Sequence, residues 1–228
     1  MPSTLSPLPA LRYSPLMTLI TKHILVLFLF ASLPFSSTAT GQETAAQSQV
    51  TTPWSTALIQ SAREQIGVTL IYDGSYQSLE FPNGDVPRQR GVCTDVVIRA
   101  LRDAHSFDLQ AKVNADMKAH FSSYPKFWGL SRPDSNIDHR RVPNLITYFK
   151  RHRADVPMTD EPQDYLPGDI VTWMLRPGTP HVGIVSDKVD PQSGNPLIIH
   201  NIGWGTREND ILFAYEMTGH FRPENGNY

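Results

Sequence analysis

The spacing of apolar residues changes near the middle of the chain, and this change constrains the fold more than any other feature. In the first half, apolar residues recur at the three- and four-residue spacing of amphipathic helices. The expected helices lie at 54–66, from Cys93 to about 104, at 109–121 and at 145–149. In the second half, short β-prone runs alternate with turns rich in Pro, Gly and Asp. The expected strands are 169–175, 181–186, 196–202 and 211–215. Helices followed by strands predict an α+β fold, with N-terminal helices packed on a C-terminal antiparallel sheet.

The N-terminus has the three parts of a secretory signal peptide. Residues 24–33 (ILVLFLFASL) are almost all apolar, but a membrane-spanning helix needs about 20 such residues. Lys22 and His23 precede the run, and small polar residues follow it. We therefore expect residues 1–40 to be a signal peptide, with Met17 as an alternative start, and the protein to be periplasmic or secreted. The alternative is an uncleaved membrane anchor.

The rest of the chain is expected to form one domain. Residues 41–52 are polar and are expected to be a linker, residues 53–222 the domain, and residues 223–228 a tail. Removal of the signal peptide removes Arg12 and Lys22 but no acidic residue, so the formal net charge changes from −2 to −4. A protein that coats nucleic acid needs a basic surface. We expect no nucleic-acid partner and no stable membrane span after signal cleavage.

The chain has a single cysteine, Cys93, which excludes an internal disulfide and a multi-cysteine zinc site. Cys93 lies where a glycine-containing loop meets the start of an expected helix. The unpaired N–H groups and the dipole of a helix N-terminus stabilise a thiolate, so this position predicts a lowered pKa and a nucleophilic thiol. The alternative is a buried cysteine that packs as a small hydrophobic residue.

Two histidines follow Cys93 on neighbouring expected strands. His181 begins one strand and His200 lies on the next. If the two strands pair as a hairpin, both imidazoles lie at the same end of it. A nucleophile needs a base, and the base needs an orienting group. His181 and His200 are therefore candidates for these two roles. We favour His200 over Asn201, which would face the other way on the same strand, and we expect Asp169 to serve local turn structure.

These residues resemble the NlpC-type, papain-like cysteine peptidases and the related CHAP amidases. The resemblance rests on Cys93 at a helix start and on two strand motifs, His181-Val182-Gly183-Ile184-Val185 and Ile198-Ile199-His200-Asn201, after a Pro-Gly-Asp turn at 167–169. It runs from about Trp54 to Tyr215. The chain is also similar to an exported bacterial family filed as a domain of unknown function.

The resemblance implies a papain-like fold in which the helix of the nucleophile packs on the antiparallel sheet. It implies that Cys93 is the nucleophile, His181 the base and His200 the orienting residue, with Tyr72 near the thiol. The reaction it implies is acyl transfer through a thioester, without a cofactor or a metal. Residues 107–152 have no counterpart in the resemblance, so their role stays open.

The polar stretch 136–141 contains two arginines, Arg140 and Arg141. Arginine binds carboxylates with two parallel hydrogen bonds, so these residues are candidates for substrate binding. The peptides of peptidoglycan carry free carboxylates, and an exported enzyme meets that polymer. A solvated loop that docks through salt bridges is the alternative for this stretch.

The sequence leaves three functions open. The first is a secreted cysteine hydrolase that cleaves an amide bond in peptidoglycan or another peptide substrate. The second is a zinc-dependent hydrolase with Cys93, His181 and His200 as ligands. The third is a non-catalytic module that binds the cell wall. The oligomeric state and the bond cleaved do not follow from the sequence.

Overall fold

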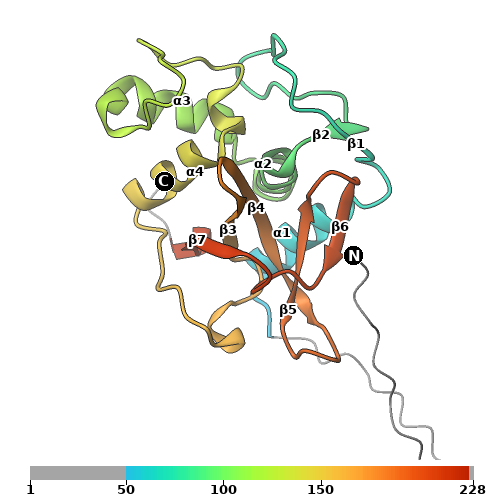
Figure 1. Ribbon diagram of the computed structural model, residues 1–228. Coiled ribbons are helices and arrows are strands. Elements are labelled where there is room, and N and C mark those ends of the chain that lie inside the picture. Colours follow the sequence, from blue (N-terminus) through green and yellow to red (C-terminus); the bar gives the residue numbers. More distant parts are fainter. Residues whose placement is uncertain (1–49, 226–228) are drawn as a thin grey trace, which may run out of the picture. The chain divides into compact units, whose positions relative to one another are not determined.

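The computed structural model describes residues 50–225, and these form helices followed by a sheet (Figure 1). The helices are α1 (Pro53–Arg63), α2 (Cys93–His105), α3 (Leu109–His120) and α4 (Val142–Arg151). The sheet contains β3 (Ile170–Arg176), β4 (Thr179–Val189), β5 (Pro196–Asn201), β6 (Thr206–Asn209) and β7 (Glu216–Phe221). Two short strands, β1 (Ile71–Tyr72) and β2 (Arg90–Gly91), pair separately and in parallel. The expected α+β class is therefore confirmed.

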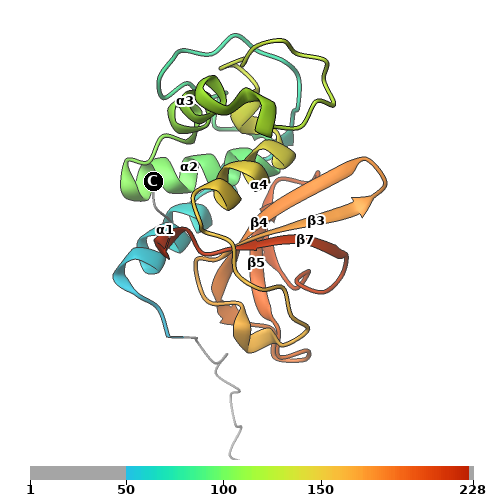
Figure 2. The same cartoon turned by 90° about the vertical axis from the view of Figure 1, so that its left-hand side faces the viewer.

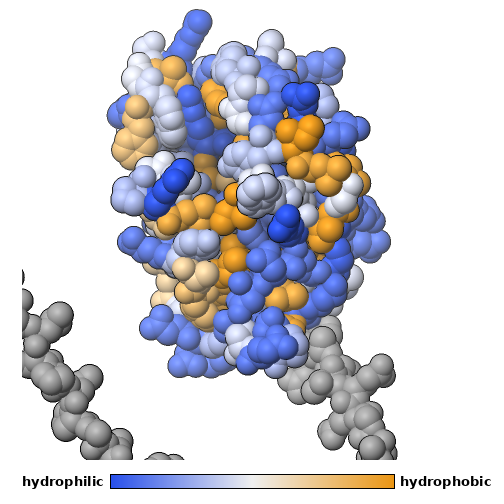
Figure 3. All heavy atoms as spheres, turned by 45° about the vertical axis from the view of Figure 1, so that its right-hand side comes forward, coloured by the Kyte–Doolittle hydropathy of each residue, from blue (hydrophilic) through white to orange (hydrophobic). Residues whose placement is uncertain are grey.

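The predicted segments 1–40 and 41–49 lie outside the described residues. The last residues of the expected linker are described, and there Thr52 caps α1 by accepting a hydrogen bond from the Ser55 backbone N–H. At the other end, Pro223–Asn225 forms a single 3₁₀ turn. Within residues 50–225, no helix is long and apolar enough to cross a membrane. On the face seen in Figure 3, hydrophobic side chains form several groups separated by hydrophilic residues.

The sheet is a meander with one added strand. Its order is β6-β5-β4-β3-β7, and every neighbouring pair is antiparallel. Strands β3 to β6 follow one another along the chain, and β7 returns to the far edge beside β3. On the paired strands β4 and β5, Gly183 lies opposite His200. His181 and His200 are therefore diagonal neighbours on one face of the sheet.

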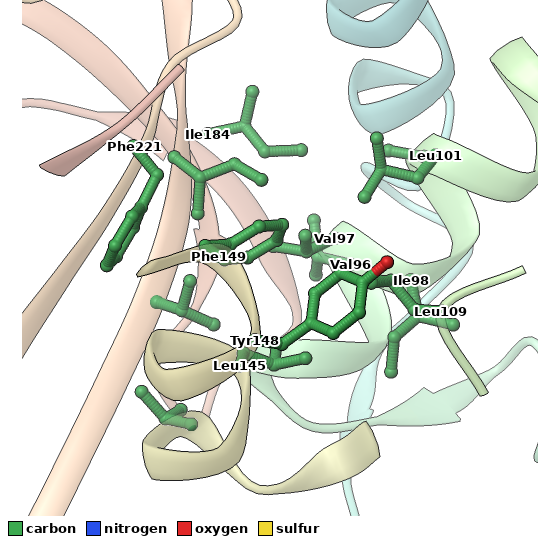
Figure 4. Close-up of a cluster of buried hydrophobic side chains, with 14 of the residues drawn as sticks. Val96, Val97, Ile98, Leu101, Leu109, Leu145, Tyr148, Phe149, Ile184 and Phe221 are labelled. Atoms are coloured by element: carbon green, nitrogen blue, oxygen red, sulfur yellow. The ribbon is translucent and has the colours of Figure 1, made fainter. Parts of the chain in front are cut away.

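The helices cover one side of the sheet, with α3 beyond α2 (Figure 2). The core between the layers is apolar and is built from elements that are distant in sequence. Val96 and Val97 of α2 meet Phe149 of α4, and Ile184 and Phe221 of the sheet close the cluster (Figure 4). Packing of this kind, rather than local propensity, stabilises such short helices.

One predicted strand is wrong. Residues 211–215 form a turn between β6 and β7, and both of these flanking strands were missed. The run is apolar because Ile211 and Leu212 cover the face of the sheet opposite the helices, where Leu212 accepts a hydrogen bond from Trp173 Nε1 at 2.9 Å. Strand β6 is polar because it is an edge strand, so it lacks the apolar alternation that predicts a strand.

Several boundaries also differ from the prediction. Helix α1 ends at Arg63, three residues before the end of the predicted periodicity, and turns follow it. In the β-prone run 68–72, only Ile71–Tyr72 forms a strand, and both of its residues are exposed. Helix α2 begins at Cys93 as expected.

Candidate active site

Cys93 is the first residue of α2 and lines a cavity of about 350 Å³. The side chain is only 4% exposed. Three other residues singled out from the sequence line the same cavity, namely Tyr72, Arg140 and Arg141. The structure therefore brings the expected nucleophile and the expected substrate-binding residues to one place, although they come from three separate segments.

The thiol of Cys93 is surrounded by hydrogen-bond donors but is fully buried. The backbone N–H groups of Val182, Thr94 and Cys93 itself point at the sulfur and favour the thiolate. Burial disfavours the charged form more strongly, and the Asp95 carboxylate acts in the same direction, so the pKa of Cys93 is raised to about 11. The expectation of a lowered pKa is wrong, because the helix N-terminus acts on a group from which water is excluded.

The contact with Val182 places the Cys93 sulfur against the first part of β4, one residue from His181. His181 is also buried. Burial, and then the nearby charge of a protonated His200, lower the pKa of His181 to about 3. Burial lowers the pKa of His200 as well. At neutral pH the site therefore contains a neutral thiol and two neutral imidazoles.

A chain of hydrogen bonds leads from His181 to the edge of the sheet. His181 Nε2 lies 2.9 Å from His200 Nδ1, and His200 Nε2 lies 2.9 Å from Asn209 Oδ1. The sequence indicated the two histidines but not Asn209, because β6, which carries Asn209, was not predicted. The only sequence signal for Asn209 was its position nine residues after His200, where the next strand of an antiparallel meander could bring its amide beside His200.

The alternatives to His200 have other partners. Asn201 donates from Nδ2 to the carbonyl of Gly91 at 3.1 Å, so it anchors the loop that leads into Cys93. Asp169 accepts hydrogen bonds from His220 Nε2 and from the Arg222 guanidinium, each at 2.8 Å. Asn201 therefore positions the nucleophile's loop, and Asp169 belongs to a separate buried cluster.

Arg140 lines the cavity, but its guanidinium is already occupied. It donates two hydrogen bonds of 2.9 Å to the carboxylate of Asp95, and both side chains are buried. Asp95 in turn accepts a 2.7 Å hydrogen bond from the backbone N–H of Val92, at the start of α2. Arg140 thus holds the loop around Cys93 in place, and its predicted role in binding a substrate carboxylate stays a prediction. The stretch is not a solvated loop either, since Asp138, His139 and Arg140 are buried.

Arg141 and Tyr72 are better placed to meet a substrate. Arg141 bonds Asp138 through Nη1 at 2.9 Å, and its guanidinium carbon lies 4.0 Å from the centre of the Trp128 ring, which also lines the cavity. Tyr72 is 46% exposed overall, but its hydroxyl contacts the Cys93 sulfur. The partial loss of water around the hydroxyl, followed by the charge of the thiolate, raises the pKa of Tyr72. The hydroxyl therefore stays protonated and can donate a hydrogen bond at physiological pH.

Within residues 50–225, no group of three or more His, Cys, Asp or Glu side chains has an arrangement that could hold a metal ion. Cys93, His181 and His200 therefore do not form a recognisable set of zinc ligands in this arrangement.

Comparison with known proteins gives two matches. Over 166 residues the chain is 55% identical to a protein of Escherichia coli (strain K12) named "Uncharacterized protein YijF", which covers 73% of this chain and 80% of that protein. Residues 59–223, which include every residue of the candidate site, match the family described as "Domain of unknown function (DUF1287)". The chain therefore belongs to the DUF1287 family.

Proposed function

We propose that this protein is an exported cysteine hydrolase with an NlpC-type, papain-like fold, and that it cleaves an amide bond in peptidoglycan peptides. The observation that supports this most is the position of Cys93. It begins a helix, lines a cavity, and lies against β4, the strand that carries His181, which is hydrogen-bonded to His200 on β5. A nucleophile, a base and an orienting group in this order are the parts that acyl transfer requires.

In the proposed first step, the Cys93 sulfur attacks the carbonyl carbon of the amide. Because the resting thiol and imidazole are both neutral, the S–H proton passes to His181 as the S–C bond forms. Nε2 of His181 is engaged with His200, so Nδ1 is the nitrogen that takes this proton. The carbonyl oxygen becomes an oxyanion beside the N–H groups that converge on the sulfur and beside the Tyr72 hydroxyl.

The intermediate collapses when the C–N bond breaks. The leaving amine takes the proton from His181, and a thioester between Cys93 and the acyl group remains. A water molecule then attacks the thioester carbonyl and gives a proton to His181. The S–C bond breaks, the carboxylic acid leaves, and the proton returns to the sulfur. No oxidant or reductant is consumed.

The substrate class is proposed from the residues that line the cavity and from the expected periplasmic or secreted location. Arg141 presents a cation beside the flat face of Trp128 at the cavity wall, about 4.0 Å away. A peptide with a free carboxylate near the scissile amide fits this pair, because charge-assisted hydrogen bonds to Arg are strong. Peptidoglycan peptides have such carboxylates, and a periplasmic or secreted protein encounters them.

Mass spectrometry of purified muropeptides after incubation with the protein tests the proposal. We expect defined cleavage products with the wild type and none with Cys93→Ala. Arg141→Ala should raise KM by about 10–100-fold for a substrate with a free carboxylate, and it should change KM little for the amidated form. Cleavage by Cys93→Ala at the wild-type rate would contradict the proposal.

The same assay separates the two alternatives. Activity that is lost in a chelator and restored by zinc would identify a zinc-dependent hydrolase. Binding to the muropeptides without cleavage, unchanged in Cys93→Ala, would identify a non-catalytic wall-binding module.

A further inference from the structure

Asn209 ends the chain of hydrogen bonds that begins at His181. It lies on the edge strand β6, beside β5, and its exposed position contrasts with the buried imidazoles that precede it. Its carbonyl oxygen Oδ1 faces His200 Nε2 at 2.9 Å. No other side chain of residues 50–225 has a hydrogen bond to that nitrogen.

The oxygen of Asn209 determines where the protons of both imidazoles lie. An amide oxygen only accepts hydrogen bonds, so Nε2 of His200 must carry a proton. A neutral imidazole has one N–H, so Nδ1 of His200 is then an acceptor. His181 must therefore donate from Nε2 across the 2.9 Å contact. This leaves the lone pair of His181 on Nδ1, the nitrogen that takes the thiol proton in the proposed mechanism.

If the Asn209 amide had the reverse orientation, the donor and acceptor roles in both hydrogen bonds would be exchanged. Its NH₂ group would donate to His200 Nε2, His200 would donate from Nδ1, and His181 would accept at Nε2. Nδ1 of His181 would then carry a proton and could not take another from a neutral thiol. The catalytic competence of His181 thus depends on which atom of a surface amide faces His200.

We propose that Asn209 is a positioning residue that fixes the tautomers of His200 and His181, so that Nδ1 of His181 stays unprotonated and can act as a base. The catalytic part of this proposal rests on the proposed function, because it gives Asn209 a role in that reaction. The tautomer assignment itself depends only on the hydrogen bonds.

Two other residues lie near His181 and His200, but neither could fix their tautomers in place of Asn209. Arg207 lies directly opposite His200 on β6, and its charge contributes to the lowered pKa of His200. This effect keeps His200 neutral but does not select a tautomer. Trp173 contacts His181 with its ring, at a centroid distance of 5.8 Å. It orients the imidazole but offers no acceptor to either histidine, because its indole N–H donates to Leu212.

The tautomers can be observed directly in the full-length protein by long-range ¹H–¹⁵N correlation spectra of histidine side chains. Three proteins are compared with the wild type. Asn209→Asp keeps an acceptor in place, and Asn209→Ala removes it. Asn195→Ala is the matched control, because Asn195 bonds Asp210, the residue next to Asn209, and neither imidazole.

We expect the wild type, Asn209→Asp and Asn195→Ala to show both His181 and His200 as the Nε2–H tautomer. In Asn209→Ala, water can donate or accept, so both signals should change toward a mixture. With muropeptides as substrate, kcat should fall by about 10–100-fold in Asn209→Ala, as is usual when a supporting hydrogen bond is lost. It should recover most of that loss in Asn209→Asp, with KM changed little.

A wild-type spectrum in which His181 carries its proton on Nδ1 would overturn the proposal, and so would unchanged tautomers in Asn209→Ala. These spectra need no substrate. If the wild type has the expected tautomers but does not cleave muropeptides, the proposed function fails and the role of Asn209 stands.

Discussion

Replacement of Arg140 by alanine distinguishes between two roles for this residue, a structural role and the binding of a substrate carboxylate. The guanidinium makes two 2.9 Å hydrogen bonds to Asp95 and also donates to the backbone carbonyls of Asp73 and Ser75. The side chains of Arg140 and Asp95 are only 2% and 4% exposed. Arg140→Ala would therefore leave a buried carboxylate without its cation, at the N-terminus of the helix that carries Cys93.

Removal of one partner of a buried ion pair costs about 3–5 kcal/mol. For a domain of this size, 1 kcal/mol corresponds to about 2–4 °C in Tm. We therefore expect the Tm of Arg140→Ala to fall by roughly 6–20 °C. Urea unfolding followed by circular dichroism gives the free energy directly. In the double variant Arg140→Met/Asp95→Asn the loss should be smaller than the sum of the single losses, because no unpaired charge stays buried.

Arg90→Ala is the matched control, because Arg90 also pairs with an aspartate, Asp73, but in an exposed position. Its urea midpoint should stay close to that of the wild type, since exposed ion pairs contribute little. If Arg140→Ala unfolds at the same urea concentration as the wild type while its KM rises, Arg140 binds substrate and does not serve to hold the loop around Cys93.

Three further predictions concern the thiol, the hairpin and the buried histidines. Alkylation of Cys93 by iodoacetamide should be slow at pH 7 and should accelerate about tenfold per pH unit toward its pKa of about 11; a rate that levels off below pH 8 would indicate a resting thiolate instead. In Gly183→Ala, the new Cβ would lie 2.5 Å from the nearest side-chain atom on β5 and 3.1 Å from Cβ of His200, so urea unfolding should show a loss of about 1–3 kcal/mol, and an unchanged midpoint would contradict this packing. The pKa values of His139 and His181 are lowered by burial to about 4 and about 3, so between these values and about 6.5 the unfolded chain binds more protons. The free energy of unfolding should therefore fall as the pH drops from 6.5 toward 4, with a shallower slope in His139→Gln; a stability that rises on acidification would refute this.

The sequence predicted those parts of the fold that have a clear local signal. Helix α2 begins at Cys93 as expected, because its apolar stripe starts there and packs on the sheet. The predicted strand 211–215 is wrong because its apolar residues, Ile211 and Leu212, are buried in a turn. Burial explains an apolar run in either case, and only the surrounding structure distinguishes the two.

In the candidate site, too, only the residues with a clear local signal could be predicted from the sequence. His181 and His200 could be placed together, because residues on paired strands meet in a regular register. Asn209 could not, because its strand is polar and lies at an edge. The raised pKa of Cys93 and the occupied guanidinium of Arg140 depend on burial by residues that are distant in sequence. Local sequence shows the charge of a group, but it does not show how much water reaches it.

The central claim is that Cys93 is the nucleophile of an amide hydrolase, and muropeptide cleavage by matched proteins tests it most directly. Wild type, Cys93→Ala and the control Asn195→Ala are incubated with the same muropeptides, and the products are followed by mass spectrometry over time. We predict defined products at comparable rates with the wild type and the control, and none with Cys93→Ala. Products that form as fast with Cys93→Ala as with the wild type would contradict the claim.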